Sequence, residues 1–232
     1  MSYYCRNSVF RMTWRSRGVA AWVGGCLILV LSGAASAADY RIEVLEEAPP
    51  KEALSPQVAS CLESRGLKVI RGSSRTYCKI WFCKGISVGK KGEGYALADG
   101  SLVGVIQYAR KGSDFRDQEI PKGVYTMRFA SIPTDGAHEG VSPTPSFLLL
   151  TSADEDRDPA PQDVETLVEK SSQSIDSSHP AILALKPTKD GPSPQMWHDE
   201  EHDWWLLQTT VQTAGKPKPL KLALVMVGYA EE

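Results

Sequence analysis

Apolar and polar residues alternate along several short segments of the chain. The alternation is clearest at residues 40–47 and 123–130, and another apolar segment covers residues 101–109. Because successive side chains of a strand point to opposite faces, this alternation predicts strands with one buried side. Residues 67–72 and 77–85 are joined by a short polar turn and predict a β-hairpin.

Three further segments are apolar without alternation. Residues 146–152, 181–187 and 221–230 are almost continuous apolar runs, which are typical of strands buried on both faces. Proline and glycine clusters separate most of these segments, as expected for turns. Many short strands with few helices between them predict a mainly β fold, either an antiparallel β-sandwich of jelly-roll type or a barrel. A doubly wound parallel sheet would need strands and helices to alternate, which they do not.

Two segments carry helix signals. At residues 55–66, Ser55 is a good N-cap, Pro56 suits the first helical position and Gly66 suits a C-terminal cap. Residues 161–173 place apolar side chains at helical spacing, with acids on the other side. We therefore expect two short helices packed against the β-structure.

The first 37 residues have the pattern of a secretory signal. Four arginines and no acid precede an apolar run at residues 19–31, and Ala35–Ala37 reads A-S-A. The apolar run is shorter than the roughly 20 residues that a membrane-spanning helix needs. We expect cleavage after Ala37, a single mature domain at residues 38–232 and a periplasmic or extracellular location. An uncleaved signal that anchors the protein is the alternative.

The charge balance limits the class of partner. Removing the signal's four arginines from the 26 lysines and arginines leaves 22, against 28 aspartates and glutamates. A mature domain with a net charge of about −6 is not expected to neutralise nucleic-acid phosphates or to bind anionic lipid. We therefore expect no nucleic-acid partner, and membrane contact only through an uncleaved signal.

Cysteine usage allows at most one disulfide in the mature chain. Cys5 and Cys26 lie in the signal segment, which leaves Cys61, Cys78 and Cys83. On a strand, the Cα atoms of Cys78 and Cys83 would be about 16 Å apart, beyond the limit of about 7 Å for a disulfide. A disulfide would therefore join Cys61 to Cys78 or to Cys83, and three reduced thiols are the alternative.

The stretch HDEEHDWW, residues 198–205, looks at first like a zinc-binding histidine pair. A metallopeptidase carries the two histidines on a helix, with Glu directly after the first, whereas Asp199 follows His198 here. Prolines and a glycine precede the stretch, and aromatic and β-branched residues, which favour strands, follow it. We interpret HDEEHD as a turn between two strands and expect no metal there.

Residues 114–159 resemble the core of a family of uncharacterised bacterial secreted proteins. The matching elements are DFRDQ, IPKGVYTMR, DGAHEG and FLLL. The upstream helix, the IWFCK hairpin and the later HPA and LALVMVG segments also fit, so the resemblance spans most of the mature chain. Met127 stands where the family pattern has Leu. The resemblance implies no particular activity, because none is established for the family.

Polar residues beside these strands are the candidate binding residues. Asp135 and His138 lie on a proline-rich loop, residues 133–145, and could form a carboxylate–imidazole pair for acid–base work or for metal binding. The other candidates lie at predicted strand edges and could converge on that pair: Asp114, Arg116 and His179. The simpler alternative is that Asp135 caps its own turn, Arg116 pairs with a nearby acid and His138 is an exposed loop residue.

No motif identifies an enzyme class. The chain has no G-x-S-x-G elbow, phosphate-binding glycine loop or dinucleotide fingerprint. The main hypothesis is an exported, non-catalytic module that binds an envelope or extracellular ligand or protein without a cofactor. A secreted hydrolase with a His/Asp site on the 133–145 loop is the alternative, and a structural envelope component is the third. A glycan-binding module would need exposed coplanar aromatics, for which the candidates are Trp197, Trp204 and Trp205.

Overall fold

The structure, a computed structural model, describes residues 39–89, 94–132, 144–215 and 218–228. All of these residues belong to one compact unit, Ala37–Glu232. The signal-like segment at residues 1–37 lies outside the described ranges, so its cleavage stays a prediction. Within those ranges, the structure has no helix with the length and apolar character that crossing a membrane requires.

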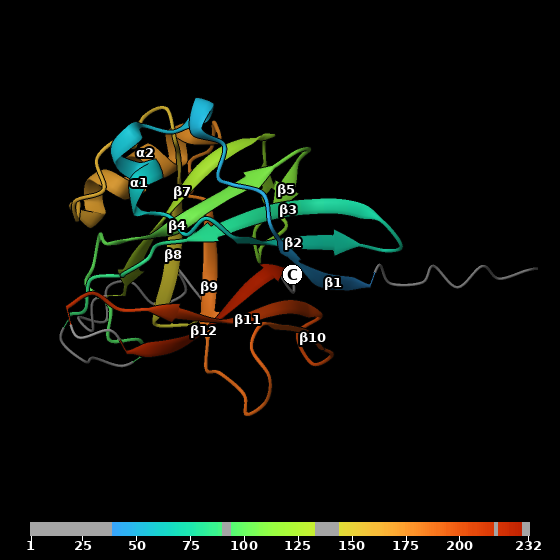
Figure 1. The fold of residues 1–232 in the computed structure, drawn as a ribbon. Coiled ribbons are helices and arrows are strands. Elements are labelled where there is room, and N and C mark those ends of the chain that lie inside the picture. The colour runs from blue at the N-terminus through green and yellow to red at the C-terminus, as the bar shows by residue number, and fades with distance from the viewer. Residues whose placement is uncertain (1–38, 90–93, 133–143, 216–217, 229–232) are drawn as a thin grey trace, which may run out of the picture. The chain divides into compact units, whose positions relative to one another are not determined.

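Ten of the described strands form one antiparallel sheet (Figure 1). They are hydrogen-bonded in the order β1-β2-β3-β4-β7-β8-β9-β12-β11-β10, and the short strands β5 and β6 pair with each other. The strands are Tyr40–Leu45 (β1), Gly66–Arg71 (β2), Arg75–Phe82 (β3), Leu102–Tyr108 (β4), Gly112–Ser113 (β5), Glu119–Ile120 (β6), Gly123–Ser131 (β7), Ser146–Ser152 (β8), Ile182–Lys186 (β9), Gln195–Asp199 (β10), Trp204–Gln212 (β11) and Pro219–Val227 (β12).

The sheet curls until its two edge strands meet, so that it is nearly barrel-shaped. β1 and β10 are the two ends of the strand order, yet they are in contact. Beside them, the ring centroids of Tyr40 and Trp205 are 5.4 Å apart. The prediction of a mainly β, antiparallel fold with two helices is confirmed. The finer prediction of a jelly-roll sandwich stays a prediction, because the strands join in one continuous sheet.

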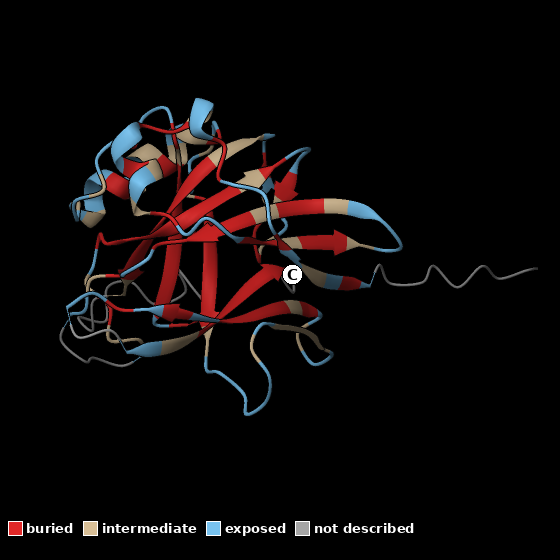
Figure 2. Ribbon diagram, in the orientation of Figure 1, coloured by how far each residue is buried: buried red, intermediate tan, exposed pale blue. Residues whose placement is uncertain are grey.

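Some strands, among them β8 and β9, are buried along nearly their whole length (Figure 2). Along β8, Leu148 and Leu150 point to the inner face and belong to the larger hydrophobic cluster, whereas Phe147 and Leu149 belong to a second cluster on the outer face. Leu167 of helix α2 is part of this second cluster, so α2 covers the outer face. This two-sided burial explains the continuous apolar runs and confirms the prediction made from them.

Helix α1, Pro56–Cys61, begins as predicted but ends earlier. The Ser55 hydroxyl oxygen accepts a hydrogen bond from the backbone N–H of Val58 at 3.1 Å, which caps the helix. The predicted C-cap, Gly66, is instead the first residue of β2, so that prediction is wrong. Gly66 suits its place for another reason, because a Cβ there would lie 2.4 Å from the carbonyl oxygen of Ile80.

Helix α2, Val164–Ser174, begins within the predicted segment, residues 161–173, and ends one residue beyond it. Its N-cap is Asp163, whose carboxylate accepts the backbone N–H of Thr166 at 3.0 Å. Three short elements have no counterpart in the sequence prediction: β5, β6 and the 3-10 helix η1, Lys51–Ala53. Elements of two or three residues are too short to show a period, so pattern analysis could not find them.

The cysteines that the structure describes are free thiols. Cys78 lies in β3, and Cys83 directly follows that strand; both are buried, whereas Cys61 is partly exposed. Leu62 forms a β-bridge with Cys83, and the backbone N–H of Lys84 donates to the Cys61 carbonyl at 2.8 Å. Cys61 and Cys83 therefore lie on neighbouring segments, which makes Cys83 the better of the two predicted disulfide partners.

Candidate functional site

A pocket of about 730 Å³ lies between helix α2 and the outer face of the sheet. We call it the α2 pocket. Its apolar lining comes from α2, from β8 and β9, and from the segments beside them: Ile132, Phe147, Val164, Val168, Pro180 and Ile182. Its polar lining consists of Asp99, Arg116, Ser131 and Glu165. Ligand pockets typically measure about 300–1,000 Å³ and combine apolar walls with a few placed polar groups, which is the arrangement seen here.

Asp114 fixes Arg116 in the wall of this pocket. The carboxylate of Asp114 is buried and accepts the backbone N–H groups of Arg116 at 2.8 Å and of Gln118 at 3.1 Å. Nη2 of Arg116 donates to Oδ2 of Asp114 at 2.9 Å and to the carbonyl of Pro180 at 2.8 Å. Among the described residues, Nη1 of Arg116 has no acceptor, and the side chain is 26% exposed. One end of the guanidinium is therefore available to an oxygen of a ligand.

The structure brings Asp114, Arg116 and the backbone of His179 together. Nε2 of Gln118 donates to the carbonyl of His179 at 3.2 Å, next to the contact between Arg116 and Pro180. The side chain of His179 is exposed, so this residue takes part through its backbone. Arg116 pairs with a nearby acid, as the simpler of the two sequence-based alternatives predicts.

The other two predicted site residues, Asp135 and His138, lie outside the described residues. The proposed carboxylate–imidazole pair and its convergence with Asp114 therefore stay predictions. The alternative of a hydrolase rests on that pair, and it stays a prediction too.

A buried polar cluster holds the loop that leads into α2, and the sequence analysis missed it. Arg128 of β7 and Asp156 are fully buried and joined by two 2.8 Å hydrogen bonds, Nε to Oδ2 and Nη2 to Oδ1. Nη1 of Arg128 donates to the carbonyls of Gly100 at 2.9 Å and Ala160 at 2.7 Å, and Nη2 donates to the carbonyl of Asp158. All five N–H groups of this guanidinium thus have acceptors.

The carboxylate of Asp156 is equally well satisfied. It also accepts hydrogen bonds from the hydroxyl of Thr126 and from Nε2 of Gln162. Gln162 lies two residues before α2, and its backbone N–H donates to the Gly100 carbonyl at 3.2 Å. The cluster therefore positions the start of α2, which forms one wall of the pocket. In the sequence, Thr126 and Arg128 stand on the polar side of an alternating strand, a pattern that predicts exposure on that side. Both side chains are buried instead, and nothing in the local pattern indicates this.

The HDEEHDWW stretch spans the end of β10, a turn and the start of β11, so the predicted hairpin turn is present. The turn is shorter than predicted, residues 200–203, because His198 and Asp199 belong to β10. The hairpin closes at Asp199, which lies opposite Trp204. Nε2 of His198 lies 2.7 Å from Oδ1 of Asp203, and Nδ1 of His202 lies 3.0 Å from Oδ2 of Asp199. The two histidines therefore pair with different acids rather than with each other.

The tryptophans near this turn do not form an open stacking platform. Trp204 is 6% exposed, and Nζ of Lys186 lies 4.7 Å from its ring centroid. Trp205 stacks on the imidazole of His198, with centroids 4.9 Å apart. Trp197 has a lysine over its ring. Since these rings already have neighbours, the glycan-binding hypothesis loses the exposed coplanar aromatics that it needs.

Comparisons of the chain with protein-family models, with curated proteins and with solved structures found no match. The resemblance of residues 114–159 to a family of secreted proteins therefore stays a prediction. The function has to be argued from the site itself.

Proposed function

We propose that the mature domain is an exported, non-catalytic binding module that holds a small, largely apolar ligand in the α2 pocket. The pocket itself is the observation that carries this proposal. It has a volume of about 730 Å³ and combines apolar walls with a partly unused guanidinium. Burial of apolar surface contributes roughly 25 cal/mol per Å². A molecule that fills the pocket would therefore gain binding free energy from the apolar surface that it buries against the pocket walls.

The polar groups around the pocket favour a ligand with one negatively polarised group. Nη1 of Arg116 is the available donor, whereas Asp99 already accepts from the backbone N–H and the hydroxyl of Ser131. The surrounding hydrogen bonds fix Arg116 and the start of α2 before any ligand arrives. A site that is organised in advance loses less entropy on binding.

The export of the protein is part of this proposal. The signal pattern at the N-terminus and the acidic mature chain support a periplasmic or extracellular location and an envelope or extracellular ligand. Side chains such as Ile106 and Phe129 fill the inner face of the sheet, so the ligand site lies outside the strands. The jelly-roll-like sandwich is the finer description that we propose for the fold, with the two halves of the curled sheet packed against each other through these inner side chains.

Binding of an anionic apolar dye, 1-anilinonaphthalene-8-sulfonate, tests the proposal. We expect saturable binding of one dye per chain, measured by calorimetry and by fluorescence of the directly excited dye. Val168→Trp should lower the affinity about tenfold or more, because Val168 lines the pocket. The matched control is Glu169→Trp, which puts the same side chain on an exposed position one residue later. Absence of dye binding, or equal affinities of the two variants, would contradict the proposal.

A further inference from the structure

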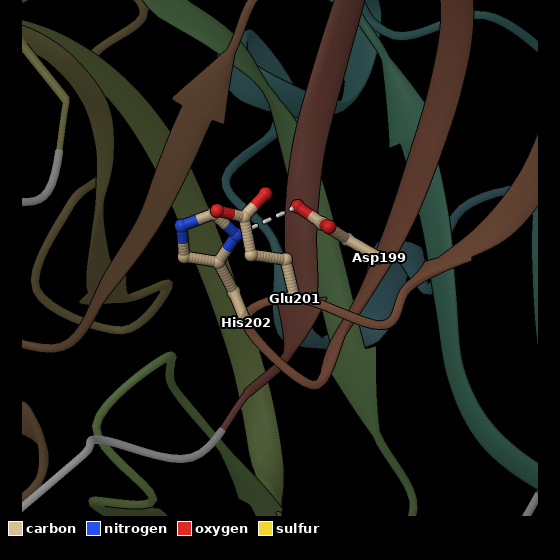
Figure 3. A group of neighbouring side chains, drawn as sticks. All are labelled: Asp199, Glu201 and His202. Atoms are coloured by element: carbon tan, nitrogen blue, oxygen red, sulfur yellow. Dashed lines mark hydrogen bonds and ion pairs between the residues drawn. The ribbon is translucent and has the colours of Figure 1, made fainter.

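The turn between β10 and β11 brings three metal-ligating side chains together, and none of them lines the α2 pocket. One ligand atom each from Asp199, Glu201 and His202 lies within 4.8 Å of the others. Figure 3 shows the Asp199 carboxylate facing the imidazole of His202, with the Glu201 side chain beside that ring. The three residues fall within a span of four, so the tight turn itself creates the cluster.

The imidazole of His202 is held in place for ligation. Its ring stacks on Trp204, with centroids 4.6 Å apart and an interplanar angle of 26°. Nδ1 already lies 3.0 Å from Oδ2 of Asp199. Two ligand atoms of one ion lie about 3–4 Å apart when each metal bond is about 2.1 Å. The His202–Asp199 pair thus has the required spacing, and only the exposed Glu201 has to move closer.

The charge of the turn favours a cation. Asp199, Glu200, Glu201 and Asp203 fall within five residues. Among the described residues, none of these acids forms an ion pair with a lysine or arginine; the two histidines are the pairing partners. A divalent ion between Asp199 and Glu201 would relieve the repulsion between their carboxylates.

We propose that Asp199, Glu201 and His202 bind one divalent transition-metal ion of the zinc class. One imidazole nitrogen with two carboxylate oxygens suits Zn²⁺ or Ni²⁺, whereas Ca²⁺ and Mg²⁺ prefer oxygen ligands alone. Water completes the coordination, because the turn is open to solvent. His198 takes no part, since it pairs with Asp203 and stacks on Trp205. The site thus differs from the histidine pair that the sequence pattern suggested and revises the expectation of no metal at this turn.

Calorimetric titration of the tag-free protein with Zn²⁺ tests this site, with Ca²⁺ as a second arm. We expect one Zn²⁺ per chain and at least tenfold weaker Ca²⁺ binding. The turn offers two matched pairs of variants. Glu201→Gln and His202→Gln should each lower Zn²⁺ affinity about tenfold or more, whereas their neighbours Glu200→Gln and His198→Gln should change it less than about threefold. Circular dichroism checks that all four variants keep the wild-type fold.

Three results would overturn the assignment. The first is the absence of stoichiometric Zn²⁺ binding. The second is equal affinity for Ca²⁺, which would mean an acidic patch rather than a nitrogen-containing site. The third is an equal loss of affinity in Glu200→Gln and Glu201→Gln with no loss in His202→Gln, which would show that net charge alone attracts the ion.

Discussion

Two arginine–aspartate pairs lie on the outer side of the sheet, and they differ in how many N–H groups of the guanidinium have a hydrogen-bond acceptor. Arg128 and Asp156 are fully buried, and every N–H group of that guanidinium has an acceptor. Arg116 also pairs with a buried aspartate, Asp114, but its own side chain is 26% exposed and lines the α2 pocket. The Arg128–Asp156 pair holds the loop before α2 against the sheet, whereas the Arg116–Asp114 pair leaves an N–H donor of Arg116 beside the α2 pocket.

This difference separates a structural role from a binding role. A saturated, buried guanidinium has nothing left to offer a ligand, and removing it leaves a buried charge without a partner. A guanidinium with an unused donor at the edge of an apolar pocket can contribute to binding at small cost to the fold. The contrast predicts that substitutions at the first pair affect stability and that substitutions at the second affect ligand affinity.

The largest effect is expected from Arg128→Met. It leaves the Asp156 carboxylate buried without its charge partner, which should lower the free energy of unfolding by about 3–5 kcal/mol. Chemical denaturation of the purified protein measures this. Adding Asp156→Leu to the same variant should restore part of the loss, because the orphaned charge is then gone. A loss below about 1 kcal/mol would mean that the buried pair does not hold the loop.

The next effect concerns a disulfide near the Arg128 cluster. Cys83 lies beside the segment of Cys61, since Leu62 forms a β-bridge with Cys83, and the backbone N–H of Cys83 donates to the carbonyl of Val103 in β4, the strand next to that of Arg128. Oxidation should link Cys61 to Cys83 and stabilise the protein by about 3 kcal/mol, since the crosslink closes a loop of about 22 residues. Non-reducing peptide mapping identifies the link, and thermal unfolding with and without reductant gives its effect. Cys83→Ala should abolish the link and Cys78→Ala should preserve it; a Cys61–Cys78 link would contradict this expectation.

A smaller stability effect is expected from Arg116→Met. Asp114 keeps two backbone N–H donors, so the free energy of unfolding should fall by about 1–2 kcal/mol. Affinity for the anionic dye should fall about tenfold, whereas affinity for a neutral analogue, N-phenyl-1-naphthylamine, should stay nearly unchanged. Lys111→Met removes the same charge from an exposed ion pair and should alter neither affinity. Equal losses for both dyes would show that Arg116 shapes the pocket without contacting the ligand's charge.

The smallest effect appears at alkaline pH in the reduced protein. Burial raises the pKa of the Cys83 thiol from its ordinary value of 9.0 to about 12. Because the folded-state pKa is raised, the buried protonated thiol makes its full contribution to the free energy of unfolding below the unfolded-state pKa. That contribution is lost as the pH rises toward the folded-state pKa, because the thiol then ionises in the unfolded chain but not in the folded one. Between about pH 8 and pH 9.5 this thiol should account for a loss of about 1 kcal/mol. In this pH range the free energy of unfolding should fall less steeply with pH in Cys83→Ala than in the wild-type protein. Identical slopes would contradict the claim that ionisation of Cys83 lowers the stability.

Features that depend on neighbouring residues could be predicted from the sequence. The alternating and continuous apolar runs predict most of the strands. Ser55 and Pro56 predict the start of α1, and the composition around HDEEHD predicts a hairpin turn. That Arg116 pairs with a nearby acid was also among the predicted alternatives, and the structure shows that the acid is Asp114, two residues away. In each case the interacting groups lie within a few residues of one another.

Features that depend on distant segments could not be predicted. Arg128 and Asp156 are 28 residues apart, and Gln118 and the carbonyl of His179 are 61 residues apart. Periodicity carries no information on such contacts. Gly66 was interpreted as a helix cap because nothing in the sequence shows how closely the backbone of β3 approaches it. The α2 pocket is likewise formed by segments spread from Asp99 to Ile182.

The central claim is that the α2 pocket is the binding site, and mapping a bound ligand tests it most directly. Isotope-labelled protein titrated with the anionic dye should show its largest amide chemical-shift changes around Val168, Arg116 and Ile182. Residues of the β10–β11 turn should shift little, because they do not line the pocket. Shifts that cluster at the turn, or that scatter over the surface without saturating, would contradict the claim.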